Sequence, residues 1–172
     1  MSSPNEVPQP PQPPPFERRL KFPPLQIVGM VYILILPVLA VLGVFGESFA
    51  SIDASGPTLE MSVDYPSRYR YKMTNPVNVT LRNVSGEVLD TVTVSFDADY
   101  IDQFSNVTFT PSVDTVTGNE YQVELTDIGP GETRVVTVEI RAERYWRHSG
   151  TITASPGSGE PIEVEISTTV FP

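Results

Sequence analysis

The clearest structural pattern in the sequence lies in VNVTLRNVSGEVLDTVTVSF, residues 77–96. Apolar residues occupy alternate positions on both sides of one short break: Val77, Val79, Leu81, Val92, Val94 and Phe96. A two-residue period places these side chains on one face and the polar ones on the other, which predicts two half-buried strands. The break, residues 83–86, is rich in turn-forming residues, so a tight connection is expected between the strands.

The same alternation recurs on both sides of this segment. Its apolar positions are Leu59, Met61, Val63, Tyr65, Val107, Phe109, Tyr121, Val123, Leu125, Val136, Val138, Ile140, Ile152, Ala154, Ile162, Val164 and Ile166. Glycine- and proline-containing turns separate them at residues 117–119, 129–131 and 155–159. Short strands with one apolar face each must bury those faces against a second sheet. Residues 58–172 are therefore predicted to form an all-β sandwich of seven or eight antiparallel strands.

A second segment, LTDIGPGETRVVTVEI (residues 125–140), strengthens this prediction. Together the two segments resemble the immunoglobulin-like domains of bacterial adhesion-related and envelope proteins. In those domains one strand ends at an Asn-x-Gly-like turn and a later strand begins after a Pro-Gly-Glu turn. The matching positions are Asn83, Gly86, Pro130, Gly131 and Glu132. The resemblance covers about residues 75–155 and implies the fold but no function, because this fold carries many roles.

Upstream lies an uncharged apolar run, LQIVGMVYILILPVLAVLGVF, residues 25–45. At 1.5 Å per residue a helix of this length spans about 30 Å, the thickness of a bilayer core. We therefore predict a transmembrane helix over residues 25–46, in which a central proline is tolerated. Its glycines either admit a neighbouring helix or simply face lipid. The residues expected within the membrane include Ile27, Leu34, Pro37, Leu42 and Phe45.

The flanks of this run predict its orientation. Three basic residues, Arg18, Arg19 and Lys21, precede it, and acidic residues follow it. The positive-inside rule then places residues 1–24 in the cytoplasm and residues 58–172 outside a bacterial plasma membrane. The first 24 residues hold nine prolines and form either an extended docking strap or a disordered spacer. Residues 47–57 are small and polar and are predicted to be a linker.

Charge and composition limit the functional classes. After the apolar run there are 19 acidic and 8 basic residues. Such an acidic domain is expected to repel nucleic acid and anionic lipid headgroups, unless the charge serves only solubility. Cysteine is absent, which excludes disulfides, thiolate metal sites and thiol catalysis.

No catalytic or cofactor motif is evident. The single histidine, His148, has no nearby nucleophile in the sequence, so we expect no enzymatic activity. Asp97, Asp99 and Asp102 lack the glycine and glutamate of a calcium-binding loop, which favours a solvated strand end over a metal site. No cofactor is expected, and the three Asn-x-Ser/Thr sequons at Asn78, Asn83 and Asn106 are interpreted as chance occurrences.

Two clusters combine aromatic and basic residues, which are the types enriched at protein–protein hot spots. The candidate partner contacts in these clusters are Tyr69, Arg70, Tyr71, Arg144, Tyr145, Trp146 and Arg147. The alternative for the second cluster is that Trp146, the single tryptophan, fills the core while the arginines are merely solvated.

Two functional hypotheses follow from this layout. The first is a non-catalytic, single-pass accessory subunit of a larger bacterial membrane complex, such as a respiratory or photosynthetic one. Its partners would be other membrane-protein subunits and the lipid bilayer, and not nucleic acid. The second is a free-standing, membrane-anchored binding or adhesion module on the outer side.

Overall fold

The computed structural model describes residues 23–43, 46–157 and 159–172 of the chain. The chain divides into two compact units, of which the first ends at Leu39 and the second runs from Ala40 to Pro172. Arg18, Arg19, Lys21 and Phe45 lie outside the described residues, and so does most of the proline-rich tail. The predictions made for them stay predictions.

Helix α1 (Pro24–Val41) carries no charged residue, and none of its residues is buried. It is long and apolar enough to cross a membrane once, a test that an N-terminal signal sequence also passes. The helix ends at Val41, five residues before the predicted end, so Leu42 lies in the turn that follows. Gly43 has φ +74°, a left-handed conformation that favours glycine and ends helices.

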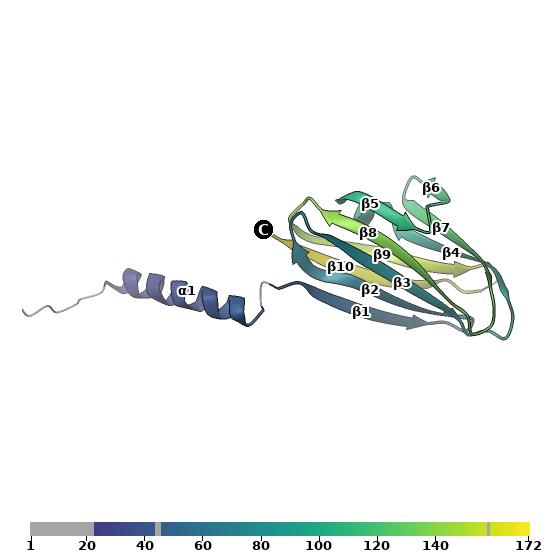
Figure 1. Ribbon diagram of the computed structural model, residues 1–172, viewed down its shortest axis with the longest axis horizontal. Helices are drawn as coiled ribbons and strands as arrows, with labels where there is room; N and C mark the ends of the chain where they lie inside the picture. Colours follow the sequence, from purple (N-terminus) through teal and green to yellow (C-terminus); the bar gives the residue numbers. More distant parts are fainter. Residues whose placement is uncertain (1–22, 44–45, 158) are drawn as a thin grey trace, which may run out of the picture. The chain divides into compact units, whose positions relative to one another are not determined.

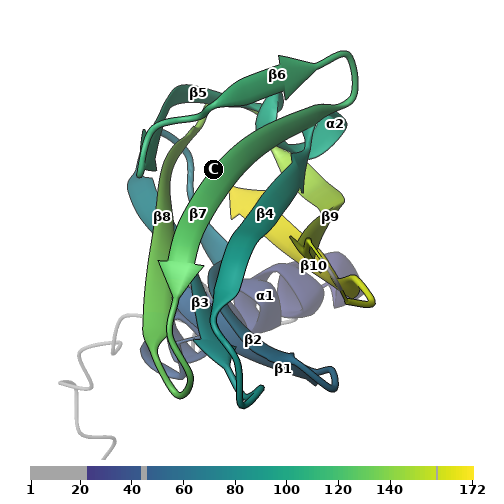
Figure 2. The ribbon, with the colours of Figure 1, turned by 90° about the vertical axis from the view of Figure 1, so that its right-hand side faces the viewer.

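The second unit is an all-β domain with ten strands in one curled sheet, in the order β5-β8-β3-β2-β10-β9-β4-β7-β6, with β1 paired to β2 (Figure 1). β3 and β8 lie on one side of the domain, and β9 and β10 lie on the other (Figure 2). The strands are β1 (Ser48–Ser55), β2 (Leu59–Arg70), β3 (Thr74–Asn83), β4 (Leu89–Asp97), β5 (Phe104–Thr110), β6 (Thr115–Thr117), β7 (Glu120–Ile128), β8 (Thr133–Ala142), β9 (Trp146–Pro156) and β10 (Ile162–Phe171).

This arrangement corrects two details of the sequence prediction. There are ten strands among the described residues instead of seven or eight, and they are not all antiparallel. β10 runs parallel to β2 over three residue pairs, from Thr169↔Arg68 to Phe171↔Arg70. Because this pairing joins segments that are far apart in the sequence, no local sequence pattern predicts it.

The predicted linker, residues 47–57, was wrong for most of its length. Residues Ser48–Ser55 form β1, which pairs antiparallel with β2. Ala50, Ile52 and Ala54 pack partly buried against the core, while the residues between them face solvent. Their alternation was hidden because small residues carry a weak apolar signal. Residues 48–55 adopt a strand conformation because their backbone pairs with that of β2.

The core lies inside the curl of the sheet and confirms the apolar positions read from most of the strand patterns. Fully buried examples are Val79 on β3, Val94 on β4 and Ile166 on β10. Helix α2 (Ala98–Ile101) adds Tyr100, whose hydroxyl lies 2.9 Å from Thr168 Oγ1. Thr168 Oγ1 in turn donates to the carbonyl of Pro66, so a buried hydrogen-bonded chain joins three segments.

The two turns of the immunoglobulin-like resemblance meet in space. The amide of Asn83 donates to the carbonyl of Glu132, and the amide of Gly131 donates to the carbonyl of Asn83. The side chain of Asn83 is fully buried beneath this junction. Residues separated by nearly fifty positions therefore fasten the ends of β3 and β8 together.

Alkaline pH is expected to destabilise the β domain. Burial raises the pKa of Tyr69 and the pKa of Tyr100 well above the ordinary value of 10.0. Above about pH 10 the unfolded chain therefore loses phenolic protons that the folded chain retains, so the free energy of unfolding falls as pH rises. The stabilisation is complete below pH 10. Urea titrations of the wild type and of Tyr69→Phe and Tyr100→Phe should show a smaller alkaline slope in each variant, whereas equal slopes would contradict this origin.

Candidate interaction surface

One end of the β domain brings together two connections that are distant in sequence. The β2–β3 turn contains Tyr71, Lys72 and Met73, and the β8–β9 connection contains Arg144 and Tyr145. The amide of Lys72 donates to the carbonyl of Ala142 at 2.8 Å, and the amide of Ala142 donates to the carbonyl of Met73 at 3.2 Å. The β3–β8 pairing positions these connections side by side.

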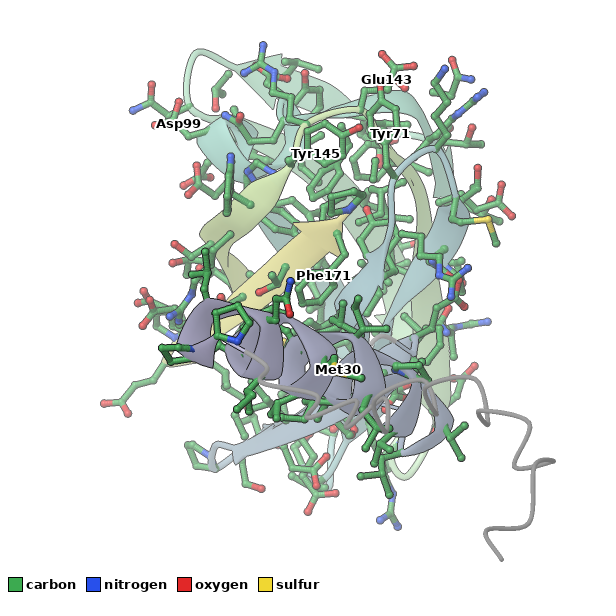
Figure 3. All side chains as sticks on the ribbon, turned by 90° about the vertical axis from the view of Figure 1, so that its left-hand side faces the viewer. Met30, Tyr71, Asp99, Glu143, Tyr145 and Phe171 are labelled. Atoms are coloured by element: carbon green, nitrogen blue, oxygen red, sulfur yellow. The ribbon has the colours of Figure 1, made fainter. Side chains whose placement is uncertain are left out.

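Aromatic rings from both connections pack against each other on this end. The rings of Tyr71 and Tyr145 lie 4.6 Å apart between centroids, and Figure 3 shows them side by side. The ammonium of Lys72 lies 5.4 Å from the centroid of the Tyr71 ring, within the range of a cation–π contact. The Tyr71 amide also donates to the carbonyl of Phe171, which fixes the turn to the end of β10.

Trp146 is the most informative residue of this end. It is 81% exposed, so the alternative that it fills the core is excluded. Its backbone has φ +84°, a conformation that is rare for bulky residues and costs free energy. A large aromatic residue that is both exposed and strained contributes little to the fold. Such outliers concentrate at functional sites, which supports a binding role.

Exposed basic residues lie on the same two connections and on the adjoining strand ends. Arg144 donates to Gln103 Oε1 at 2.9 Å, and Arg147 donates to Ser167 Oγ at 2.6 Å. Both acceptors are neutral, so these contacts do not compensate the arginine charges. We call the set Arg70, Tyr71, Lys72, Met73, Arg144, Tyr145, Trp146 and Arg147 the aromatic–basic surface.

One predicted contact residue does not belong to this surface. Tyr69 is 1% exposed and its ring stacks on Phe104, so the prediction that it contacts a partner was wrong. Tyr69 continues the odd-numbered, core-facing positions of β2, whereas Arg70 points to the opposite face. The remaining six predicted contacts, Arg70, Tyr71, Arg144, Tyr145, Trp146 and Arg147, lie at the same end of the domain.

The histidine and the aspartates take structural positions. The ring of His148 packs edge-on against Phe104, and its Nε2 lies 3.2 Å from the carbonyl oxygen of Arg144. Asp97 accepts from the amide of Asp99 and caps α2, while Asp102 accepts from the hydroxyl of Tyr121. No group of three or more potential metal ligands occurs among the described residues. None of these contacts brings a nucleophile to the histidine.

A shallow polar groove lies elsewhere on the domain, on the outer face of β4, β7, β9 and β10. Its volume is about 330 Å³. Hydroxyl, amide and carboxylate side chains line it: Ser95, Asp97, Asn119, Glu120, Thr151, Thr153 and Glu163. Sequence analysis did not single out this groove, because outward-facing polar positions on strands carry no distinguishing pattern.

Replacing Trp146 by glycine is expected to leave the free energy of unfolding unchanged or to raise it by up to about 1 kcal/mol. Glycine adopts positive φ without a Cβ clash, and the exposed indole buries little area. The matched control is Ser149→Gly, an exposed position of β9 at which φ is not positive, where a loss of about 0.5–1 kcal/mol is expected. Urea unfolding of the chain in detergent measures both. A loss for Trp146→Gly as large as the control's would show that the indole serves the fold.

No family model matches the chain, and no curated protein sequence matches it. Among solved structures, the CARDB domain of a Pyrococcus furiosus protein, in complex with di-metal ions, is 13% identical; the match covers 68% of this chain and 97% of that one at a TM-score of 0.42. The bacterial hydrophobin BslA is 13% identical, with coverages of 73% and 100% and a TM-score of 0.39. A β-glucosidase from Listeria innocua is 12% identical, with coverages of 74% and 16% and a TM-score of 0.33. Similarity at this level assigns no activity to the chain.

Proposed function

We propose that this chain is a non-catalytic, single-pass accessory subunit that stabilises a larger bacterial membrane protein complex. α1 crosses the plasma membrane once, the proline-rich tail lies in the cytoplasm, and an immunoglobulin-like sandwich lies on the outer side. The tail and the helix contact membrane subunits, and the β domain binds and stabilises extracytoplasmic subunits.

The observation that carries the proposal is the apolar surface of α1. Its large side chains are exposed around the helix, with Ile27 at 51% and Leu34 at 73%. A helix that is apolar on every side is stable where lipid or other transmembrane helices surround it. The interior proline, Pro37, leaves a carbonyl without its helical partner, which a neighbouring helix can satisfy.

The described residues of the β domain support a binding role over a catalytic one. Its exposed aromatic and basic side chains are of the types found at hot spots, while His148 is engaged in packing and a backbone contact. The acidic remainder of the surface keeps such a domain soluble between partners.

The orientation is tested with single cysteines, which the cysteine-free chain makes straightforward. Gly118→Cys lies in an open turn of the β domain, and Ser3→Cys lies in the tail. A membrane-impermeant maleimide should label Gly118→Cys in intact cells and Ser3→Cys only after lysis. The reverse pattern would overturn the orientation, and labelled chain released into the medium would show that α1 is a cleaved signal.

Complex membership is tested by solubilising membranes in mild detergent and fractionating by size. The chain should migrate with a larger assembly, and that assembly should lose subunits or shrink when the chain is deleted. If the chain migrates alone while every membrane complex keeps its size without it, the accessory-subunit proposal fails.

The polar groove favours a second candidate, a free-standing membrane-anchored module that binds a soluble, hydroxyl-rich ligand. Its lining offers several donors and acceptors at close spacing, including Asn119, Thr151 and Thr153. Titration of the chain with cell-wall saccharides should then perturb the amide NMR signals of these residues. Thr151→Val with Thr153→Val should abolish the effect, and the absence of any perturbation counts against this candidate.

A further inference from the structure

We propose that the aromatic–basic surface is a lipid-contact surface, which seats the β domain on the headgroup region of the anionic bilayer that holds α1. This inference rests on the membrane anchor of the proposed function, but not on membership in a complex. It adds a contact surface and assigns its partner as phospholipid headgroups.

The first argument is the strand register at the point where the chain enters the domain. Ser48, the first residue of β1, pairs with Arg68 of β2. Arg68 pairs with Thr169 of β10, and Thr169 pairs with Arg147 of β9. At about 4.8 Å between neighbouring strands, Arg147 lies within about 15 Å of the entry point along this row.

The second argument is the short tether. α1 ends at Val41 and β1 begins at Ser48, so only residues 42–47 join them. Fully extended, this segment reaches at most about 25 Å. A tether of this length permits the row that contains Ser48 and Arg147 to reach the membrane surface.

The third argument is the distribution of charge. Six of the eight basic residues that follow the apolar run lie at this end: Arg68, Arg70, Lys72, Arg141, Arg144 and Arg147. The other two, Arg82 and Arg134, lie toward the opposite end of β3 and β8, beside Glu60 and Glu132. The net negative charge of the domain therefore hides one end where basic residues outnumber acidic ones, although Glu143 and Asp99 also lie there (Figure 3).

This distribution changes the expectation drawn from composition. An acidic domain as a whole repels anionic headgroups, but attraction to a membrane acts over about one Debye length. Four exposed basic residues at one end would lie closest to the membrane in this orientation: Arg70, Lys72, Arg144 and Arg147. The local charge, and not the net charge, decides the interaction.

The fourth argument is the chemistry of the exposed apolar groups. Tryptophan and tyrosine are enriched at both interfaces of a bilayer, where an apolar ring and a polar N–H or O–H are satisfied together. Trp146 is 81% exposed, Tyr145 is 42% exposed and Met73 is 45% exposed. Aromatic residues interspersed with basic ones match the composition of an interfacial anchor.

The test uses the full chain, because Trp146 is its single tryptophan and reports on this surface directly. The chain is reconstituted into vesicles of phosphatidylcholine and phosphatidylglycerol that carry bromine near the headgroup end of the acyl chains. Bromolipid is expected to quench Trp146 emission, and aqueous iodide is expected to quench it weakly. Flotation of the same sample first establishes that α1 is inserted.

The matched control moves the reporter to the opposite end. In Trp146→Phe with Val88→Trp, the indole replaces an exposed valine in the β3–β4 connection. This connection follows Asn83, and the ten residues of β3 place Asn83 about 30 Å from Thr74. Bromolipid quenching of Trp146 should exceed that of the control about threefold or more. Equal bromolipid quenching of Trp146 and of the control, with equal accessibility to iodide, would overturn the proposal. The aromatic–basic surface would then be assigned to a protein partner.

A charge variant separates attraction to headgroups from simple proximity. Replacing Arg70, Lys72, Arg144 and Arg147 by glutamine should reduce bromolipid quenching of Trp146 in anionic vesicles. It should have less effect in vesicles of phosphatidylcholine alone. Undiminished quenching in anionic vesicles would contradict the role of the basic residues. If the wild-type chain does not float with the vesicles, the prediction that α1 is a membrane anchor fails. If the chain floats but belongs to no larger complex, the accessory-subunit proposal fails and this inference still holds.

Discussion

Replacing Asn83 by alanine is expected to lower the free energy of unfolding of the β domain by about 3 kcal/mol. The side chain of Asn83 is fully buried and uses both its donor and its acceptor groups. Its Nδ2 donates to the carbonyls of Glu87 and Ile128, each at 2.8 Å. Its Oδ1 accepts from the amide of Ser85 at 2.9 Å and from the Ser85 hydroxyl at 2.6 Å.

Alanine removes these four hydrogen bonds. The carbonyl of Ile128, which accepts a buried hydrogen bond from Asn83, loses this donor. An unsatisfied buried polar group costs more than the lost bond contributed, so the effect exceeds that of an ordinary surface substitution. The junction between the β3–β4 and β7–β8 turns also loses the side chain beneath it. Urea unfolding of the full chain in detergent, followed by far-UV circular dichroism, gives the measurement.

The matched control is Asn78→Ala, on the same strand. Asn78 is partly exposed and accepts one side-chain hydrogen bond, from the hydroxyl of Thr137 at 2.9 Å. A loss of about 1 kcal/mol is expected there. If the two variants were equally destabilised, the buried network of Asn83 would not be the determinant proposed here.

The second large effect is expected for Gly150→Ala. Gly150 lies within β9, where an added Cβ would lie 2.8 Å from Tyr100 Cγ and closer still to Tyr100 Cβ. Neither atom can move freely, because the Tyr100 hydroxyl bonds to Thr168 and the ring packs edge-on against Phe104 at 5.0 Å. The overpacking is expected to cost about 3 kcal/mol.

Gly118→Ala is the control for this substitution, since an added Cβ at Gly118 meets no atom within 4 Å. Its free energy of unfolding should stay within about 0.5 kcal/mol of the wild type. The same urea titration compares the two variants. A Gly150→Ala protein as stable as Gly118→Ala would mean that α2 shifts at little cost, and that Tyr100 does not hold β9 in register.

The candidate surface shows where sequence reasoning succeeds and where it fails. The aromatic and basic residue types identified six of its residues, because composition reflects chemistry directly. The same reasoning included Tyr69, although its odd-numbered position on β2 matches the core-facing positions Leu59 and Met61. Strand period was the better guide there. Trp146 could not be assigned either way, because no local pattern encodes its exposure or its positive φ.

The apolar helix, the all-β class and most core positions were predictable from the sequence, because each depends on the local pattern of apolar side chains. The sequence also contained the two turns that meet at Asn83. Three features became visible only in the folded chain: β1 joins the sheet, β2 pairs in parallel with β10, and basic residues about seventy positions apart in sequence share one end. The physical reason is that these features arise from hydrogen bonds between strands that are remote in the chain, and such pairings leave no trace in any single segment.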